Sequence, residues 1–234
     1  MSGKTRLLLK LSGGALASEG DAFDEDKLQD LAKQLKELSK LYSLGIVVGG
    51  GNLWRGREGR LGFLKSNERD YIGMVSTIIN CFVLQKALES EGIKAKLFSA
   101  IEVERITDRY TLSEIESSLG GGEIALFAGG VGEPCYSTDS AAIIRAIEIG
   151  AKEVFIGKEG VKGIYDKDPN VFEDAVFLSK VSYDYLITKD LRVIDQSSIK
   201  LARDNKLRLV LFDQEAENSF VKAVKGEIEF SEVV

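Results

Sequence analysis

The sequence of 234 residues contains no histidine. This absence excludes Ser-His-Asp and Cys-His catalytic groups, phosphohistidine chemistry and metal sites that depend on imidazole ligands. Any catalysis by this chain therefore depends on lysine, arginine, aspartate, glutamate, hydroxyl and backbone groups.

Cysteine is scarce as well. The two cysteines, Cys81 and Cys135, lie far apart and no C-x-x-C spacing occurs, so we expect neither a disulfide framework nor a zinc site. Near the N-terminus a basic residue leads directly into a short apolar run, and we expect no signal-peptide core there. No run is expected to reach the length of about 18 apolar residues that a membrane span requires. These features predict a cytoplasmic protein with no membrane partner.

A basic patch is also missing. The formal net charge is −6, and 31 Lys and Arg residues are interspersed with 37 Asp and Glu residues, which predicts no nucleic-acid partner. An acidic chain can bind anionic ligands only through local lysines and arginines, backbone N–H groups and helix N-termini. The length and the apolar content of 44% suit one domain spanning residues 1–234.

What the sequence does contain is a regular alternation of short apolar runs and amphipathic stretches. Leucines at i, i+3 and i+4 spacing predict a helix from Asp26 to Tyr42, with Asp24 as its N-cap and Gly45 as its stop. Further helices are predicted at residues 68–90, 112–119, 138–149, 196–205 and 215–224. Strands are predicted at residues 6–11, 46–48, 95–98, 123–128, 153–156 and 207–212, with a short strand at the C-terminus. Residues 157–181 carry turn signals and predict a hairpin and loop.

This order of elements predicts an α/β fold, a three-layer sandwich whose mostly parallel central sheet is covered by helices on both faces. Ligands of such sheets bind outside the carboxyl ends of the strands. Three predicted strands run directly into glycine there, in the segments KLSGG (10–14), GGGN (49–52) and GGVG (129–132). One such loop suits an ordinary turn, whereas three at one edge of a sheet indicate a surface for a phosphate chain.

The common phosphate-binding motifs are absent. The sequence has no G-x-x-x-x-G-K-[ST], no G-x-G-x-x-G after the first strand, and no H-R-D or D-F-G. These absences exclude P-loop kinases and protein kinases, and they argue against a nicotinamide dehydrogenase. The glycine loops predict a kinase of another architecture.

Each of three charged residues beside these loops has two interpretations, one structural and one functional. Lys10 ends an apolar strand, where it either extends to solvent or neutralises donor phosphates. Asp139, in the run Ser-Thr-Asp at 137–139, is either a helix N-cap or the group that orients Lys10. Asp70 lies in the first turn of a predicted helix, where an acid is favourable in any case, and it also suits a ligand contact.

Seven segments resemble bacterial uridylate (UMP) kinases of the amino-acid-kinase fold, in the family's order and over nearly the whole chain. They are KLSGGAL (10–16), VVGGGNLWRG (47–56), DYIGMVSTIIN (70–80), YSTDSAA (136–142), VKGIYDKDP (161–169), LRVIDQSS (191–198) and LARDNKL (201–207). The resemblance implies a nucleoside-monophosphate kinase that transfers the γ-phosphoryl group of ATP to UMP, giving UDP for pyrimidine nucleotide biosynthesis. It also implies an acceptor lobe at roughly residues 1–150 and a donor lobe at roughly residues 151–234.

Carried over residue by residue, the resemblance implies three groups of site residues. The catalytic group would be Lys10, Arg55, Asp139 and Asp195. ATP would contact Lys10, Leu11, Ser12, Gly13, Gly51, Arg55, Glu159, Tyr165 and Asp168. UMP would contact Gly50, Asp70, Val131, Gly132, Glu133, Pro134, Cys135, Tyr136, Ser137 and Thr138.

The resemblance further implies Mg²⁺ as the cofactor, bound together with ATP, and no metal ligand set in the chain itself. It implies a homohexamer, activation by GTP through residues 18–23, and inhibition by UTP. Two alternatives remain at this point. One is a related kinase of the same fold that phosphorylates a carboxylate or carbamate, and the other is a non-catalytic nucleotide-binding protein.

The chain departs from the family pattern in four places. Gly14 replaces the Glu of K-L-S-G-E, and Lys162 replaces the Asp of V-D-G. Glu133, followed by Pro and Cys, stands where Asn-Pro-aromatic is common, and residues 227–234 also differ. Of these changes, Glu133 bears most directly on base specificity because it places an acid close to the acceptor.

Overall fold

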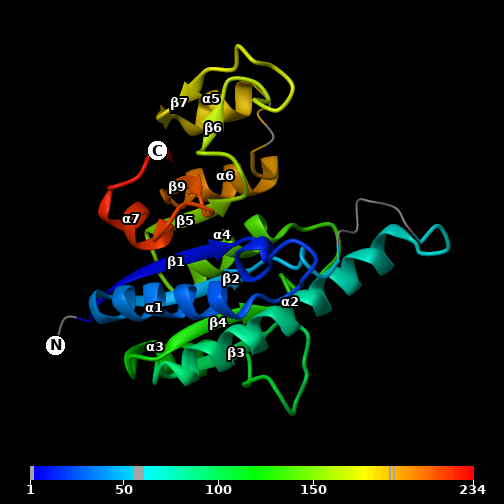
Figure 1. Ribbon diagram of the computed structural model, residues 1–234, viewed down its shortest axis with the longest axis vertical. Coiled ribbons are helices and arrows are strands. Elements are labelled where there is room, and N and C mark those ends of the chain that lie inside the picture. The colour runs from blue at the N-terminus through cyan, green and yellow to red at the C-terminus, as the bar shows by residue number, and fades with distance from the viewer. Residues whose placement is uncertain (1–2, 55–60, 190, 192) are drawn as a thin grey trace.

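The computed structural model describes residues 3–54, 61–189, 191 and 193–234. An eight-stranded sheet in the order β3-β4-β2-β1-β5-β9-β10-β8 forms its centre (Figure 1). Neighbouring strands are parallel except for the antiparallel pair β9 and β10. The strands are β1 (Thr5–Leu11), β2 (Tyr42–Val48), β3 (Ala95–Ser99), β4 (Ile124–Ala128), β5 (Glu153–Lys158), β8 (Lys180–Val181), β9 (Arg208–Asp213) and β10 (Phe230–Val233).

Helices cover both faces of the sheet, which confirms the predicted three layers. One core lies between the sheet and α1 (Glu25–Leu41), α2 (Ser66–Ser90) and α7 (Ser219–Lys225). The other core lies between the sheet and α3 (Leu112–Gly120), α4 (Thr138–Glu148), α5 (Tyr183–Thr188) and α6 (Gln196–Asp204). Both faces of the central strands are therefore apolar, as in other parallel sheets.

The alternation of side chains along β1 determines which face carries Lys10. Leu7, Leu9 and Leu11 belong to the core beneath α1, α2 and α7, whereas Leu8 belongs to the core beneath α4. Because successive strand residues point to opposite faces, Lys10 lies on the face that α4 covers. The neighbouring strand β5 follows the same rule, since Val154 and Ile156 share the core with α4 while Phe155 does not.

Most predicted elements are confirmed to within a few residues. Asp24 caps α1 by accepting a hydrogen bond from the Lys27 N–H at 3.1 Å. The hairpin predicted in residues 157–181 is present as the antiparallel pair β6 (Ile164–Tyr165) and β7 (Phe177–Leu178), which stands apart from the main sheet in Figure 1. The division into a donor lobe and an acceptor lobe stays a prediction.

The prediction that Gly45 stops the first helix is wrong. α1 passes directly into β2 at Tyr42, and Gly45 lies in the middle of that strand. A Cβ atom at Gly45 would lie 2.7 Å from Ile149 Cδ1 and 3.1 Å from the Phe127 ring. Glycine is therefore required here because α4 and β4 pack closely on β2, not because the chain turns.

Three other elements differ from the predictions. α7 begins at Ser219 rather than at residue 215, because Asn218 before it adopts a left-handed conformation with φ of 53°. The short helix α5 and the 3₁₀ turn η1 (Gly13–Leu16) were not predicted. Ser182 accepts a hydrogen bond from the Tyr185 N–H and supplied an N-cap signal for α5, but six residues are too few for a periodic pattern.

By length and composition alone α2 is apolar enough to cross a membrane, although it contains no unbroken run of 18 apolar residues. α2 contains an 18-residue window with a mean hydropathy of 1.4. Half of this window is buried inside the fold, where α2 contributes Ile78, Cys81, Leu84 and Leu88 to the core with α1. Core helices commonly have this composition, so the apolar character of α2 is explained by its packing.

Candidate active site

Glycine loops follow β1, β2 and β4 at the carboxyl edge of the sheet, as predicted. Because β1 pairs with β2 on one side and with β5 on the other, this edge contains the point where the strand order reverses. The first two loops are packed together, since a Cβ atom at Gly13 would collide with the Asn52 amide. The Gly49 N–H donates to the Leu11 carbonyl at 2.8 Å. The surface predicted for phosphates is thus formed by two loops whose backbones are in direct contact.

Two polar residues of α2, which sequence reasoning missed, anchor the loops. The fully buried Asn80 donates to the Gly49 carbonyl and to Asn52 Oδ1, both at 2.7 Å. The Thr77 hydroxyl accepts a hydrogen bond from the Gly129 N–H at 2.8 Å. Buried polar groups require such partners. Thr77 and Asn80 lie three residues apart inside an apolar helix, and this spacing was the signal that could have identified them.

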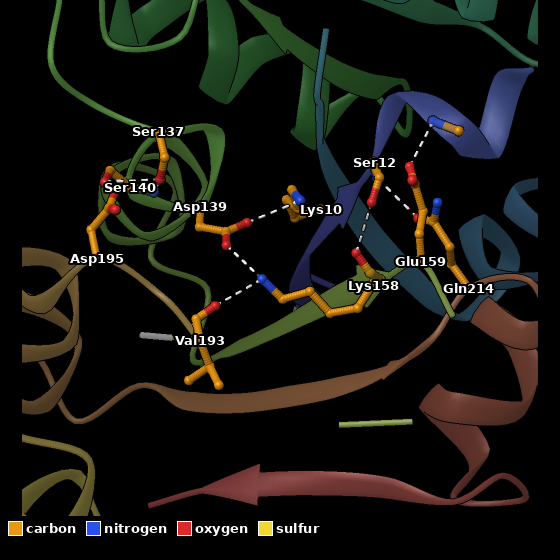
Figure 2. Close-up of polar contacts among 12 residues, drawn as sticks. Lys10, Ser12, Ser137, Asp139, Ser140, Lys158, Glu159, Val193, Asp195 and Gln214 are labelled. Atoms are coloured by element: carbon orange, nitrogen blue, oxygen red, sulfur yellow. Dashed lines mark hydrogen bonds and ion pairs between the residues drawn. The ribbon is translucent and has the colours of Figure 1, made fainter. Parts of the chain in front are cut away.

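A cluster of three charged side chains lies at the centre of the edge (Figure 2). Lys10 Nζ is 3.0 Å from Asp139 Oδ1, and Lys158 Nζ is 2.7 Å from Asp139 Oδ2. Lys10 is only 7% exposed, so the alternative in which this lysine extends to solvent is wrong. Lys158 was not among the predicted site residues.

The cluster fixes the ionisation of Asp139. Burial alone would raise the pKa of this carboxyl, but the ammonium groups of Lys10 and Lys158 have the larger combined effect and hold the pKa well below its ordinary value. Asp139 is therefore a carboxylate at neutral pH. It can orient two cations, and it is a poor proton acceptor.

The N-terminus of α4 brings Asp139 to this position. Ser137 is the N-cap, because its hydroxyl accepts a hydrogen bond from the Ser140 N–H at 3.2 Å, so the N-cap alternative for Asp139 is wrong. The Ser140 hydroxyl in turn donates to Asp195 Oδ2 at 2.7 Å, and the Ser198 hydroxyl donates to the Ser140 hydroxyl at 2.7 Å. These hydrogen bonds join the starts of α4 and α6.

A cleft of about 500 Å³ lies at the start of α4, where Ser137 and Thr138 line it just before Asp139. Its lining includes seven of the ten residues predicted for the acceptor: Gly50, Asp70, Glu133, Cys135, Tyr136, Ser137 and Thr138. Gly51 and Asp195 also line it. The other three predicted residues, Val131, Gly132 and Pro134, belong to the same loop but do not line the cleft among the described residues.

Asp70 contributes to the shape of this cleft. Because α2 begins at Ser66, Asp70 lies in the second turn and not in the first, where the sequence had placed it. The Cys135 N–H donates to Asp70 Oδ2 at 2.9 Å, in a loop where Cys135 has a φ of 71°. The carboxylate of Asp70 therefore holds the loop that forms the opposite wall.

Cys81 is buried and Cys135 is exposed, and both are free thiols.

A second cavity of about 320 Å³ adjoins the cluster at Lys158. Tyr165 and Asp168, predicted for the adenosine, line it together with Lys158 and Val193. Glu159, also predicted for ATP, instead accepts a hydrogen bond from the Gly14 N–H at 3.0 Å. A Cβ atom at Gly14 would collide with this carboxylate, so a side chain at that position would require the end of the Glu159 side chain to shift.

Of the other residues predicted for ATP, Leu11, Ser12 and Gly13 lie at the end of β1 and in the loop after it, whereas Gly51 lines the larger cleft. The Leu11 side chain is fully buried in the core, so that residue offers only backbone groups. The Ser12 N–H donates to Gln214 Oε1 at 2.9 Å, and the Ser12 hydroxyl donates to the Gly157 carbonyl at 3.2 Å. The predicted catalytic residue Arg55 lies outside the described residues.

The acidic groups of the site suit a metal ion that arrives with a nucleotide. Within residues 3–54, 61–189, 191 and 193–234, no three His, Cys, Asp or Glu residues cluster as metal ligands. Both Asp139 oxygens face lysines, and Asp195 accepts a hydrogen bond from Ser140. Mg²⁺ commonly keeps several waters and takes only one or two protein carboxylates beside substrate phosphates. This donor set fits such an ion and does not fit an all-protein metal site.

Comparison with known proteins agrees with this geometry. The model of the amino acid kinase family matches residues 5–213. A uridylate kinase from Mesoplasma florum is 40% identical over 225 residues, covering 95% of this chain and 94% of that protein. A uridylate kinase from Campylobacter jejuni is 39% identical, covering 100% of this chain and 99% of that protein. The crystal structure of UMP kinase from Ureaplasma parvum has a TM-score of 0.93 at 32% identity, covering 98% of each chain. The chain therefore belongs to the amino acid kinase family, in the branch whose members are named uridylate kinases.

Proposed function

We propose that this enzyme transfers the γ-phosphoryl group of ATP to UMP, giving UDP and ADP. One observation carries the proposal: the Lys10–Asp139–Lys158 cluster adjoins two cavities at the glycine-lined edge of the sheet. Ser137 and Thr138, which directly precede Asp139, line the larger cavity, and Lys158 lines the smaller one. The larger cavity fits the acceptor nucleotide and the smaller one fits the donor adenosine. The phosphates of both would meet at the cluster.

The side chains present suit this reaction because its acceptor needs no general base. The attacking atom of UMP is an oxygen of a phosphate that is already ionised, so positioning and charge neutralisation are sufficient. Lys10 supplies a fixed cation, and the glycine loops and the N-terminus of α4 offer backbone N–H groups. Mg²⁺, which we propose as the cofactor bound with ATP, would neutralise further phosphate charge. The absence of histidine from the chain is consistent with this chemistry.

A substrate panel tests the proposal. In a coupled assay of ADP release, we expect kcat/KM for UMP to exceed that for CMP and AMP by at least about tenfold, which corresponds to about 1.4 kcal/mol. Acetylglutamate, a carboxylate acceptor, should give no turnover. Equal rates with UMP and CMP would contradict the base assignment and would identify Glu133, which lines the acceptor cleft, as the residue to change first. Nucleotide binding without turnover would indicate a non-catalytic protein.

Regulation and assembly are part of the same proposal. UTP shares the uridine of UMP, so it should compete at the acceptor cleft, and raised UMP should relieve the inhibition. A GTP effect through residues 18–23 is supported by the Asn52 side chain, which donates to the Ala22 carbonyl at 2.8 Å and also contacts Asn80. The self-association that a hexamer requires is supported by exposed apolar residues on α2. The cytoplasm is the proposed location.

A further inference from the structure

Lys158 is the last residue of β5, and the site expected from the sequence did not include it. Its ammonium is 2.7 Å from Asp139 Oδ2 and donates to the Val193 carbonyl at 2.9 Å. The side chain is 21% exposed, so it is largely enclosed but still reachable by a ligand. Figure 2 shows it extending from β5 to the Asp139 oxygen that Lys10 does not contact.

The sheet places the two lysines together. In the β1–β5 ladder Lys10 pairs with Ile156, and Lys158 lies two residues further along β5 on the same face. The ammonium groups therefore approach one carboxylate from two strands, one at each oxygen. A single aspartate holds two cations in fixed positions at the strand ends.

This cluster carries more positive than negative charge. Among the described residues, Asp139 is the only acidic side chain within ion-pair distance of Lys10 or Lys158. One carboxylate and two ammonium groups leave a net charge of about +1 in a mostly enclosed position, where an uncompensated charge is unfavourable. Asp195 accepts a hydrogen bond from Ser140, and in Figure 2 it lies beside Ser140 and apart from the two lysines. An anionic ligand would complete the cluster.

The position of Lys158 indicates which anion it meets. Lys158 lines the smaller cavity with Tyr165 and Asp168, whereas Lys10 precedes the first glycine loop. A phosphate chain that runs from an adenosine in that cavity to the glycine loop passes the Lys158 ammonium. Lys158 therefore lies on the donor side of the transferred group.

We propose that Lys158 is a second catalytic cation, which binds the donor phosphates and neutralises the charge that develops on the departing ADP. The proposal rests on the proposed function. In the step, an oxygen of the UMP phosphate forms a bond to the γ-phosphorus, and the bond from that phosphorus to the β–γ bridging oxygen breaks. The electron pair of the broken bond remains on ADP, and no proton is transferred. Lys158 stabilises that oxygen, and Lys10 stabilises the transferring group.

The competing explanation is that Lys158 only positions Asp139. Three substitutions separate the two. Lys158→Met removes both the charge and the hydrogen bonds, Lys158→Gln keeps an uncharged donor, and Lys158→Arg keeps the charge. Lys152→Met is the matched control, because Lys152 is exposed and lies next to the opposite end of β5.

Steady-state kinetics and melting temperature are measured on all four variants. We expect Lys158→Met and Lys158→Gln to lower kcat by about a hundredfold or more, with the KM for UMP changed less than about threefold. Lys158→Arg should keep at least about a tenth of kcat, and Lys152→Met should match the wild type. If Lys158→Met does not fold, the comparison of Lys158→Gln with Lys158→Arg still shows whether kcat depends on the positive charge or on the shape of the side chain. A Gln variant with more than about a third of wild-type kcat would overturn the proposal.

A binding measurement provides a readout that a positioning role would not change. Titration calorimetry with AMP-PNP and with adenosine compares the donor with and without its phosphates. We expect the Kd for AMP-PNP to rise about tenfold or more in Lys158→Gln, as for the loss of a charged hydrogen bond, while the Kd for adenosine changes less than about twofold. Equal changes for both ligands, or none, would contradict a phosphate contact. If the wild type does not phosphorylate UMP, the proposed function fails, but this comparison still tests Lys158.

Discussion

At the scale of single residues, Lys10 is the side chain on which the proposed reaction depends most. Lys10→Met keeps most of the side-chain length, so β1 should still form. We expect kcat to fall by roughly two to four powers of ten, about 3–5 kcal/mol, because a fixed cation in an enclosed site stabilises the transferring group strongly. The affinity for UMP should change little, since that ligand lies on the other side of the transferred group.

Kinetics, UMP binding and thermal melting on the same preparation check this prediction. Lys4→Met is the matched control, because Lys4 is exposed just before the opposite end of β1. If Lys10→Met melts like the wild type and retains more than about a tenth of kcat, which is worth only about 1.4 kcal/mol, the catalytic role is wrong.

The sequence predicted some site residues and not others for physical reasons. Lys10 and Asp139 were identifiable because each adjoins a glycine loop or a helix start. Lys158 was missed because Gly157 and Lys158 were assigned to the loop after the strand. The side chains of Val154 and Ile156 lie on one face of β5, and the same two-residue spacing places Lys158 on that face. Its pairing with Asp139 depends on the order of the strands, which a single sequence does not reveal.

At the scale of elements, the long helices and buried strands were predictable because their periodic patterns extend over many residues. The predicted ends of these elements were wrong where tertiary packing, and not the local sequence, determines them. Gly45 has the local signature of a helix stop, but close packing against Ile149 and Phe127 requires it within β2. Local propensity is a weak guide when a neighbouring element determines the conformation.

Helix α2 is predicted to stabilise the acceptor loop through Thr77. Thr77→Val keeps the shape but leaves the buried Gly129 N–H without its acceptor, which should lower the free energy of unfolding by about 1–3 kcal/mol. The loop that follows Gly129 forms a wall of the acceptor cleft, so the KM for UMP should rise more than the KM for ATP. Urea unfolding and steady-state kinetics measure the two effects.

Thr188→Val is the control for this prediction, because Thr188 is exposed at the end of α5 and the same atoms are exchanged. It should leave both stability and kinetics unchanged. Equal increases of the two KM values in Thr77→Val would show that the hydrogen bond supports the whole site rather than the acceptor side.

At the scale of the whole molecule, the architecture explains how an acidic protein can bind two anionic ligands. The net charge is −6, yet two lysines lie on the one face of the sheet where β1 and β5 end beside the start of α4. The glycine loops add uncharged N–H donors at the same edge. The positive potential is therefore local and does not depend on the net charge. Composition alone indicated the need for such local groups but not where they lie.

Assembly is the last prediction at this scale, and it follows from the exposed side of α2. Tyr71, Val75 and Ile79 are spaced by four residues on one face and are 44%, 48% and 44% exposed, while the opposite face of the helix is buried in the core. A stripe of this kind on a long helix suggests a contact between copies of the chain. Ile79→Glu should therefore reduce the molar mass measured by light scattering at micromolar concentration. Leu41→Glu, at a 61% exposed apolar residue that ends α1, should leave the mass unchanged. A wild-type protein that is monomeric under these conditions would refute the prediction, as would an Ile79→Glu variant of unchanged mass.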